Sequence, residues 1–429
     1  MSEAWPAGRR RLLAGAGALV VVAALSLTLA APALADSGLG RRIAAILTRY
    51  HLAGGRTAVR VWDMDTGEQV YGRRIHALLA PASNEKLVTS ATALARWGPD
   101  QRFKTELYLP PGQPDAGGVV HGRVWLKGYG DPTLATAAYQ RSGFHARTAS
   151  LAGFVAALRA LGVRRVAGIS GDESYFDTRR TVPGWRPGLA AYCGPLSALS
   201  LNEGLRGGAR VARPALYAAD ELRRLLKDAG IAVAGDCAVG RLPTGMQLTH
   251  TEYSPPLRRV LALMNKPSDN FIAEMLAKGL GREFGGAGST AAGMRVERAF
   301  LAECGVPLSE VRLCDGSGLC YGNRLTAAGI TRVLRTMSER LDFGTFWGSL
   351  AVAGHDGTLR DRMRGTLAVG NLRAKTGTLD IASSLSGYVA SADHESLIFS
   401  VLMNGGSVNY WAARRAQDAI GAALAASHF

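Results

Sequence analysis

Strand-like segments stand at both ends of this chain with helical segments between them, and this order restricts the fold. Residues 57–72 alternate in the manner of a β-hairpin, with "DTGE" as the turn. Three further strand-like stretches, "GNLRAKTGTLD", "SSLSGYVAS" and "SLIFSVLMNG", come near the C-terminus. One sheet that joins both ends accounts for this order. We therefore expect an α+β fold, an antiparallel sheet flanked by helices.

The segments between these strands divide the chain further. Apolar spacing predicts a series of helices, at 38–51, 83–98, 254–264, 269–281, 289–304, 326–340 and 410–425. The stretch 103–250 is richer in Gly, Pro and short β-like runs, with helical pieces at 148–161 and 216–229. We interpret 103–250 as an inserted β-rich domain, which separates a first segment, 36–102, from a second, 251–429.

The first 35 residues read as a secretory signal peptide. Arg9–Arg11 give a positive region, an apolar run extends from Leu12 to about Ala31, and an A-x-A site ends at Ala35. We expect a periplasmic or otherwise extracytoplasmic protein after cleavage near Ala35. An uncleaved membrane anchor is the alternative, and "RRRLL" leaves the choice between Sec and Tat export open.

The chain is strongly basic, with a formal net charge of +16. Removal of residues 1–35, which hold three arginines and one glutamate, leaves +14. An excess of positive charge favours association with anionic partners. Nucleic acid is a poor candidate behind a signal peptide, and no basic run is interleaved with aromatic residues. An acidic polymer of the cell envelope fits better, with possible peripheral association with the membrane or the cell wall.

The five cysteines predict structure rather than chemistry. They are Cys193, Cys237, Cys304, Cys314 and Cys320. No two form a C-x-x-C pair, so we expect no zinc site, and no cofactor is indicated. An oxidising compartment favours one or two disulfides. Cys314 and Cys320 flank a glycine-rich turn, and Cys193 and Cys237 share the middle segment, but the connectivity stays open.

One lysine stands out because the chain holds only seven, against 43 arginines. Lys86 alone has a serine three residues earlier, Ser83, at the start of a predicted helix, where the two side chains share one face. A buried lysine can become neutral and act as a base, whereas arginine cannot. Alone this spacing is weak evidence, because Ser83 could be only a helix N-cap.

Two further motifs follow in the chain. Ser268-Asp269-Asn270 precedes a predicted helix, and Lys375-Thr376-Gly377 lies on a predicted strand. Separately, the first could be an N-cap and the second an ordinary exposed strand. Together, S-x-x-K, S-D-N and K-T-G in this order are the set typical of penicillin-binding proteins and class A β-lactamases.

Acyl transfer explains the residue types in these motifs. Ser83 is the candidate nucleophile and Lys86 the base that accepts its proton. Lys375, as a second cation, would disfavour protonation of Lys86. Ser268 would relay a proton to the leaving amine. Asn270 would hydrogen-bond the catalytic lysine and a substrate amide.

The remaining predicted roles concern substrate binding. Gly377 permits close approach of a ligand along the strand. The backbone N–H groups of Ser83 and Thr378 would hold the oxyanion. The hydroxyls of Thr376 and Thr378 would bind a terminal carboxylate. We expect Asp315 and Ser317 only to form a turn, and we expect His355 to be a solvated loop residue.

From Thr57 to its C-terminus the chain resembles the low-molecular-mass penicillin-binding proteins of the D-alanyl-D-alanine carboxypeptidase/endopeptidase type, peptidase family S13. The matching stretches include "LLAPASNEKLVTSATAL", "GYGDPTL", "GDESYFD", "PLSALSLNEG", "NKPSDNFIAEMLAKGLG" and "CDGSGLCYGNRLTA". The resemblance implies a transpeptidase-like domain. It also implies cleavage of D-Ala-D-Ala, or of D-Ala–diaminopimelate cross-links, in peptidoglycan stem peptides, and covalent inhibition by β-lactam antibiotics such as penicillins.

Two alternatives remain at this point. A β-lactamase of the same fold needs a deacylating carboxylate, and the chain has no E-x-x-L-N stretch. A non-catalytic peptidoglycan-binding scaffold would be expected to have lost its nucleophile, yet Ser83 is intact. The gap between Ser83 and "GDPTL" is short for the family, so one small inserted subdomain is missing, and its absence could alter substrate access and the preference for endopeptidase cleavage.

Overall fold

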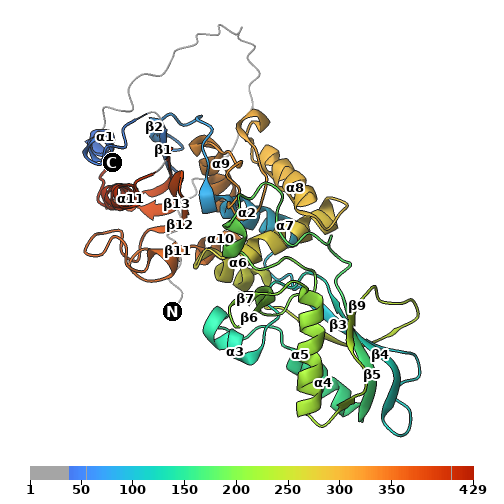
Figure 1. The fold of residues 1–429 in the computed structure, drawn as a ribbon. Coiled ribbons are helices and arrows are strands. Elements are labelled where there is room, and N and C mark those ends of the chain that lie inside the picture. Colours follow the sequence, from blue (N-terminus) through green and yellow to red (C-terminus); the bar gives the residue numbers. More distant parts are fainter. Residues whose placement is uncertain (1–37, 55, 407) are drawn as a thin grey trace, which may run out of the picture.

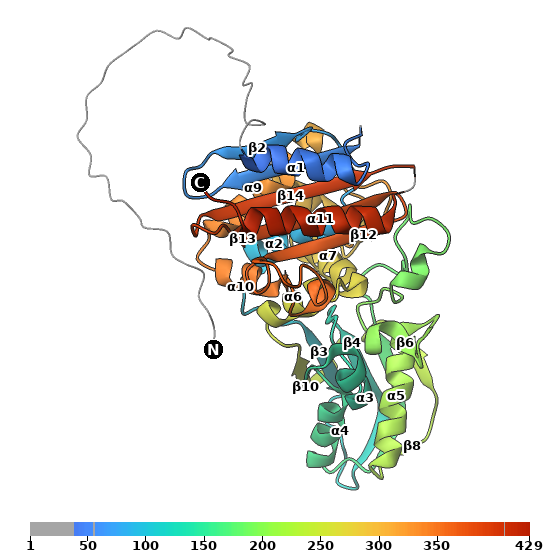
Figure 2. The same ribbon diagram turned by 90° about the vertical axis from the view of Figure 1, so that its left-hand side faces the viewer.

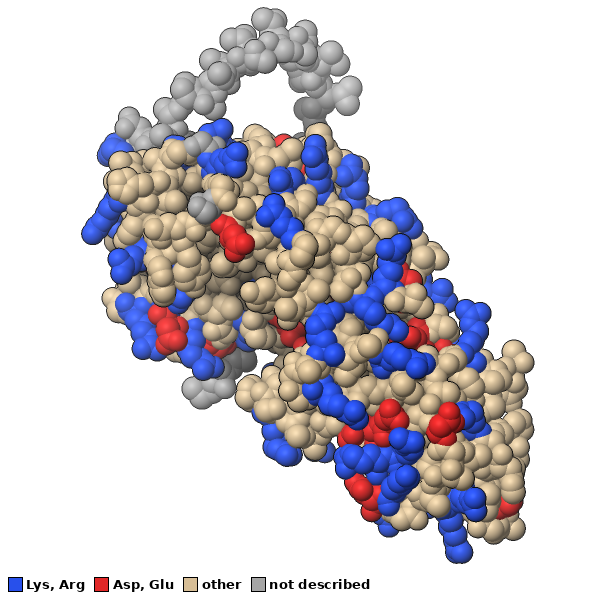
Figure 3. All heavy atoms as spheres, viewed as in Figure 1, with Lys and Arg blue, Asp and Glu red and all other residues tan. Residues whose placement is uncertain are grey.

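The computed structural model describes residues 38–429 except 55 and 407, and these form two lobes (Figures 1 and 2). The predicted signal peptide, residues 1–35, lies outside the described residues. Among the residues described, no helix is long and apolar enough to span a membrane. Lysine and arginine side chains are spread over both lobes on the face shown in Figure 3, in keeping with the basic composition.

The larger lobe is built on a six-stranded antiparallel sheet that joins both ends of the chain. In pairing order its strands are β11 (Ala351–Val352), β12 (Arg373–Leu379), β13 (Ala382–Ala390), β14 (Ser396–Asn404), β1 (Thr57–Asp63) and β2 (Gln69–Arg73). Strand β1 pairs with β14 from Thr57 opposite Met403 to Asp63 opposite Leu397. The expected sheet is confirmed, and the predicted hairpin forms one edge of it.

Helices cover both faces of this sheet (Figures 1 and 2). On one face, α1 (Gly38–Arg49) and α11 (Tyr410–Ala425) share a core with Phe399. Ile398 enters the core of the opposite face. The helices that share this second core are α2 (Glu85–Trp97), α6 (Leu257–Asn265), α7 (Asn270–Phe284), α8 (Thr290–Glu303), α9 (Ala327–Ser338) and α10 (Phe343–Ser349). Because neighbouring side chains on a strand point to opposite faces, β14 is apolar on both sides.

The smaller lobe holds a mixed sheet. Its strands are β10 (Gln247–Tyr253), β3 (Lys104–Leu109), β4 (Val119–Gly128), β5 (Arg165–Asp172), β8 (Ala232–Val233) and β9 (Cys237–Val239). Strand β3 pairs antiparallel with β10 and β4, whereas β5 pairs in parallel with β4, β8 and β9. Helices α4 (Leu151–Ala160) and α5 (Pro214–Asp228) pack against it. The boundaries of the inserted domain at 103 and 250 stay a prediction.

Short elements complete the smaller lobe. They are α3 (Ala137–Tyr139) and the ribbon of β6 (Leu205–Arg206) and β7 (Ala209–Arg210).

Helix α2 begins at Glu85, so the predicted start at Ser83 was wrong. Residues Ala82–Asn84 form a turn of 3-10 helix instead. Ala82 has a φ of +47°, and a Cβ on Gly318 would lie only 2.0 Å from its carbonyl oxygen. Contact with this distant backbone, which the local sequence does not reveal, fixes the conformation of the turn.

We expected one or two disulfides, and the described residues contain one. Cys314 and Cys320 are bonded, whereas Cys193, Cys237 and Cys304 are free thiols.

Because β14 is buried on both faces, shortening one of its side chains should lower the free energy of unfolding. Phe399 is fully buried, so Phe399→Ala should reduce the free energy of unfolding of the larger lobe by about 3–5 kcal/mol, measured by urea denaturation. Leu341 is fully exposed, and Leu341→Ala should change it by less than about 0.5 kcal/mol. Equal effects of the two substitutions would contradict this assignment of the core.

Candidate active site

The three motifs converge where α2, α7 and β12 meet. Ser83 lies in the 3-10 turn and Lys86 in the first turn of α2. Ser268 and Asn270 stand on either side of the N-cap of α7, and the K-T-G motif lies on β12. Hydrogen bonds connect Lys86 to Asn270 and Lys375 to Ser268. The fold therefore brings together residues that are almost three hundred positions apart.

Lys86 is fully buried and donates to three oxygen atoms. Its Nζ lies 3.1 Å from Ser83 Oγ, 2.7 Å from Asn270 Oδ1 and 2.6 Å from the Ser317 carbonyl oxygen. An ammonium group has three donors, so every one is used. The candidate nucleophile and the candidate base are within hydrogen-bonding distance.

The surroundings of Lys86 make it a usable base. Burial lowers its pKa to about 8, although the carboxyl groups of Asp315, Asp269 and Glu274 act in the opposite direction. A pKa near 8 leaves about a tenth of the lysine neutral at pH 7. A group with this pKa can accept a proton from a hydroxyl near neutral pH.

Lys375 is also fully buried and lies on β12. Its Nζ donates to Ser268 Oγ at 2.8 Å and to the Thr376 carbonyl oxygen at 2.9 Å. Burial and the positive charge of Lys86 hold the pKa of Lys375 well below its ordinary value. We expected Lys375 to disfavour protonation of Lys86, but the repulsion lowers the pKa of Lys375 instead, and burial is what lowers that of Lys86.

Strand β12 passes very close to the turn that carries Ser83. A Cβ on Gly377 would lie 2.2 Å from Ser384 Oγ and 2.9 Å from the backbone nitrogen of Ser83, so only glycine fits there. Asn84 ties the two segments together, because its Nδ2 donates to the Lys375 carbonyl oxygen at 2.8 Å. This places the Ser83 N–H group beside the strand that carries the second predicted oxyanion donor, Thr378.

A tight turn at the start of α7 separates the two polar side chains of S-D-N. Ser268 has a φ of +69°, and Asp269 caps the helix by accepting from the Ile272 N–H at 2.7 Å. Ser268 consequently faces Lys375 while Asn270 faces Lys86. The Asn270 Nδ2, expected to contact a substrate amide, here donates to the Tyr192 carbonyl oxygen at 2.8 Å.

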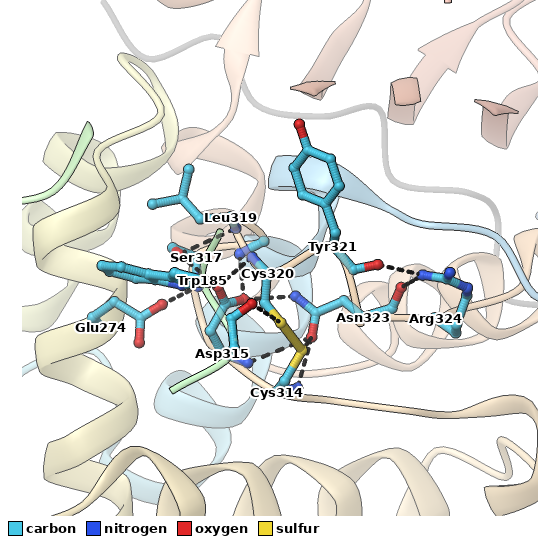
Figure 4. Close-up of a disulfide and its surroundings, with 12 residues drawn as sticks. Trp185, Glu274, Cys314, Asp315, Ser317, Leu319, Cys320, Tyr321, Asn323 and Arg324 are labelled. Atoms are coloured by element: carbon cyan, nitrogen blue, oxygen red, sulfur yellow. Dashed lines mark hydrogen bonds between the residues drawn. A yellow bond between two sulfur atoms is a disulfide. The ribbon is translucent and has the colours of Figure 1, made fainter. Parts of the chain in front are cut away.

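The turn from Cys314 to Cys320 contributes more to the site than expected (Figure 4). Asp315 and Ser317 do form a turn, but both are fully buried, and the Ser317 carbonyl accepts from Lys86. Glu274 on α7 accepts from the Ser317 N–H at 2.8 Å. Burial and Asp315 raise the pKa of Glu274 to about 8. A backbone acceptor such as Ser317 leaves no residue-type signal, and the cysteines that flank the turn were its best marker.

A small hydroxyl-lined cavity of about 210 Å³ adjoins the K-T-G strand. Thr376, Thr378 and Arg414 are among its lining residues, and Thr376 Oγ1 lies 2.8 Å from Thr358 Oγ1. Hydroxyl donors beside a guanidinium suit a carboxylate. His355 is exposed, as expected.

Among the described residues, one group of side chains is spaced closely enough to share a metal ion. It comprises Asp63, Asp65 and Glu395, near the β1–β14 end of the sheet and apart from the three motifs.

Known proteins match this chain over most of its length. A D-alanyl-D-alanine carboxypeptidase from Actinomadura sp. is 33% identical over 503 residues, covering 96% of this chain and 90% of that protein. Carboxypeptidase DacB from Mycolicibacterium smegmatis is 28% identical, covering 92% and 85%. The crystal structure of penicillin binding protein 4 from Haemophilus influenzae has the same fold, with a TM-score of 0.75 at 21% identity, covering 89% of this chain and 98% of that one.

The family model described as the D-Ala-D-Ala carboxypeptidase 3 (S13) family matches residues 39–207 and 202–427, nearly all of the described chain. This match, together with the three motifs gathered in one site, shows that the protein belongs to the S13 family of D-Ala-D-Ala carboxypeptidases.

Proposed function

We propose that this chain is a serine DD-peptidase, which cleaves the peptide bond after D-alanine in peptidoglycan stem peptides through an acyl-enzyme on Ser83. The observation that carries the proposal is the buried Lys86 ammonium group 3.1 Å from the Ser83 hydroxyl, with its pKa lowered to about 8. Membership of the S13 family supports the substrate class.

In acylation, neutral Lys86 accepts the Ser83 proton while Ser83 Oγ bonds to the carbonyl carbon of the penultimate D-alanine. The backbone N–H groups of Ser83 and Thr378 bind the oxygen that becomes negative in the tetrahedral intermediate. The C–N bond then breaks as Ser268 passes a proton to the leaving amine, and the proton taken up by Lys86 is returned to Ser268. Water hydrolyses the ester, which restores Ser83 and releases the shortened peptide.

Thr376 and Thr378 would bind the carboxylate next to the scissile bond. Terminal D-alanine carries such a carboxylate, and so does the diaminopimelate residue of a D-Ala–diaminopimelate cross-link. Both carboxypeptidase and endopeptidase cleavage are therefore compatible with this site. A β-lactam would acylate Ser83 in the same way, because ring opening keeps the leaving group attached.

The β-lactamase alternative lacks support. Among the carboxyl groups that act on the pKa of Lys86 are those of Asp315, Asp269 and Glu274, and each accepts from a backbone N–H group. The chain also has no E-x-x-L-N stretch to supply a deacylating carboxylate. The scaffold alternative leaves the buried lysine pair without a role.

We also propose that the protein acts outside the cytoplasm, where peptidoglycan is assembled. The predicted signal peptide and the mature charge of +14 support this location. The positive charge would favour peripheral association with an anionic wall or membrane surface.

Acylation of Ser83 predicts a covalent adduct. Benzylpenicillin should increase the intact mass of the mature protein by one whole antibiotic molecule, because ring opening loses no atoms, and Ser83→Ala should abolish the increase. Ser309→Ala, at an exposed serine, should leave it unchanged. No adduct with intact antibiotic would favour the scaffold, and no adduct with rapid antibiotic loss would favour a β-lactamase.

The lowered pKa of Lys86 predicts a pH-dependent rate of acylation. Only the neutral amine accepts a proton, so the second-order rate constant should fall about tenfold per pH unit below pH 8 and level off above it. Lys86→Arg, which cannot become neutral, should reduce the rate roughly 10²- to 10⁴-fold. A rate that is flat between pH 6 and pH 9 would rule Lys86 out as the base.

The role of Thr376 predicts a change in substrate binding. Thr376→Val keeps the shape but removes the hydroxyl, so KM for D-alanine release from a peptide ending in D-Ala-D-Ala should rise about tenfold. Thr48→Val, at an exposed helical position, is the matched control. An unchanged KM would mean that the carboxylate binds elsewhere.

A further inference from the structure

The seven residues from Cys314 to Cys320, named here the 314–320 turn, hold the third hydrogen-bond acceptor of Lys86. The Ser317 carbonyl oxygen lies 2.6 Å from the lysine Nζ. Gly318, with a φ of +83°, packs against the backbone of Ala82, directly before Ser83. The 314–320 turn therefore contacts both the base and the segment that carries the nucleophile.

No helix or strand runs through the 314–320 turn, so other interactions must maintain its shape. The buried carboxylate of Asp315 accepts from the N–H groups of Gly318, at 2.9 Å, and Cys320, at 2.6 Å. Asn323 donates to the same carboxylate at 2.6 Å. The disulfide joins the two ends of the turn across a Cα–Cα distance of 6.3 Å (Figure 4).

Trp185 supplies a further contact from a distant part of the chain. It lies between β5 and β6 of the smaller lobe, and its Nε1 donates to Asp315 Oδ2 at 2.7 Å. The adjacent Arg186 stacks on Tyr321, with 4.0 Å between its guanidinium carbon and the ring centroid. The segment around Trp185 therefore contacts the 314–320 turn at its buried Asp315 carboxylate (Figure 4).

We propose that the Cys314–Cys320 disulfide and Trp185 are positioning elements for Lys86, which keep the 314–320 turn closed over the lysine and hold the Ser317 carbonyl against its ammonium group. The consequence for rate rests on the proposed function, whereas the consequence for Lys86 itself does not. A seven-residue loop closed by the disulfide restricts the motion of the turn, and the Trp185 indole donates to the carboxylate around which the turn is built.

The proposal predicts how Lys86 responds when the turn is loosened. Burial is the largest cause of its lowered pKa, and the 314–320 turn supplies part of that burial. A looser turn admits water, which stabilises the ammonium form, and it also weakens the support of that form by the Ser317 carbonyl and the Asp315 carboxyl group. Because burial is the largest of these causes, the net effect is a rise of the pKa toward its ordinary value. The titratable groups that interact with Lys86 are Asp315 in the turn, Glu85 at the start of α2, Asp269 and Glu274 at α7, Cys193 between β5 and β6 in the sequence, and Lys375 on β12. All of them are retained in the variants below.

The test uses three forms of the mature protein with a loosened turn. They are the double variant Cys314→Ser/Cys320→Ser, the variant Trp185→Phe, and wild type treated with dithiothreitol, which converts the disulfide to two thiols as it is itself oxidised. The penicillin acylation rate constant at pH 7 should fall roughly tenfold to a hundredfold in each form. The acidic limb of its pH profile should move to higher pH.

A second readout reports on Lys86 without any reaction. The chain has only seven lysines, so the Lys86 side-chain carbon signal can be assigned in an NMR titration by comparison with Lys86→Arg. The pKa of Lys86 should be higher in all three loosened forms. Cys304→Ser and Trp411→Phe, at a cysteine and a tryptophan outside the turn and the motifs, are the matched controls and should show neither change.

The outcomes separate the two proposals. If wild type forms no penicillin adduct but the pKa of Lys86 rises in the loosened forms, the proposed function fails and the positioning role stands. If wild type is acylated normally and neither the rate profile nor the pKa changes in the loosened forms, the positioning role is overturned. Should the double cysteine variant fail to fold, Trp185→Phe and the reduced wild type decide the question.

Discussion

The burial of one ammonium group is the constraint on which this structure depends. Removing a charged lysine from water costs several kcal/mol, and the chain offsets this cost only by supplying an acceptor for each of the three donors. The acceptors come from Ser83, Asn270 and Ser317, three segments that are far apart in sequence. These acceptors converge only if the 3-10 turn before α2, the start of α7 and the 314–320 turn all pack against one another.

The two buried lysines have different partners: Lys86 donates to Ser83, and Lys375 donates to Ser268. Lys375 is buried near Lys86, and the charge of Lys86 disfavours the charged form of Lys375. Lys86 keeps acidic neighbours that support its ammonium form, whereas Lys375 is held by a hydroxyl and a carbonyl oxygen. The pair therefore provides a base beside the nucleophile and a polar group beside Ser268. This separation of roles suits acyl transfer, which needs proton removal at one atom and proton delivery at another.

Most long elements could be predicted from apolar periodicity. Helix α11 spans Tyr410–Ala425, as predicted. Strand β14 was predicted from a continuous apolar run, which is expected of a strand that is buried on both faces. Short elements such as α10 and the β6–β7 ribbon were not predicted, because so few residues carry no periodic signal. The start of α2 was misplaced by two residues because contact with Gly318, more than two hundred positions away, shapes the turn before it.

The sequence by itself determined the identity and order of the reactive side chains, because S-x-x-K, S-D-N and K-T-G require particular residue types at fixed spacing. It also determined the antiparallel sheet through strand patterns at both ends of the chain. Only the tertiary structure decided that the Ser317 carbonyl oxygen completes the shell around Lys86, because every residue has a carbonyl group and only its position distinguishes one from another. The same holds for the lowered pKa values of the two lysines, since burial and the distance between charges are properties of packing rather than of residue type.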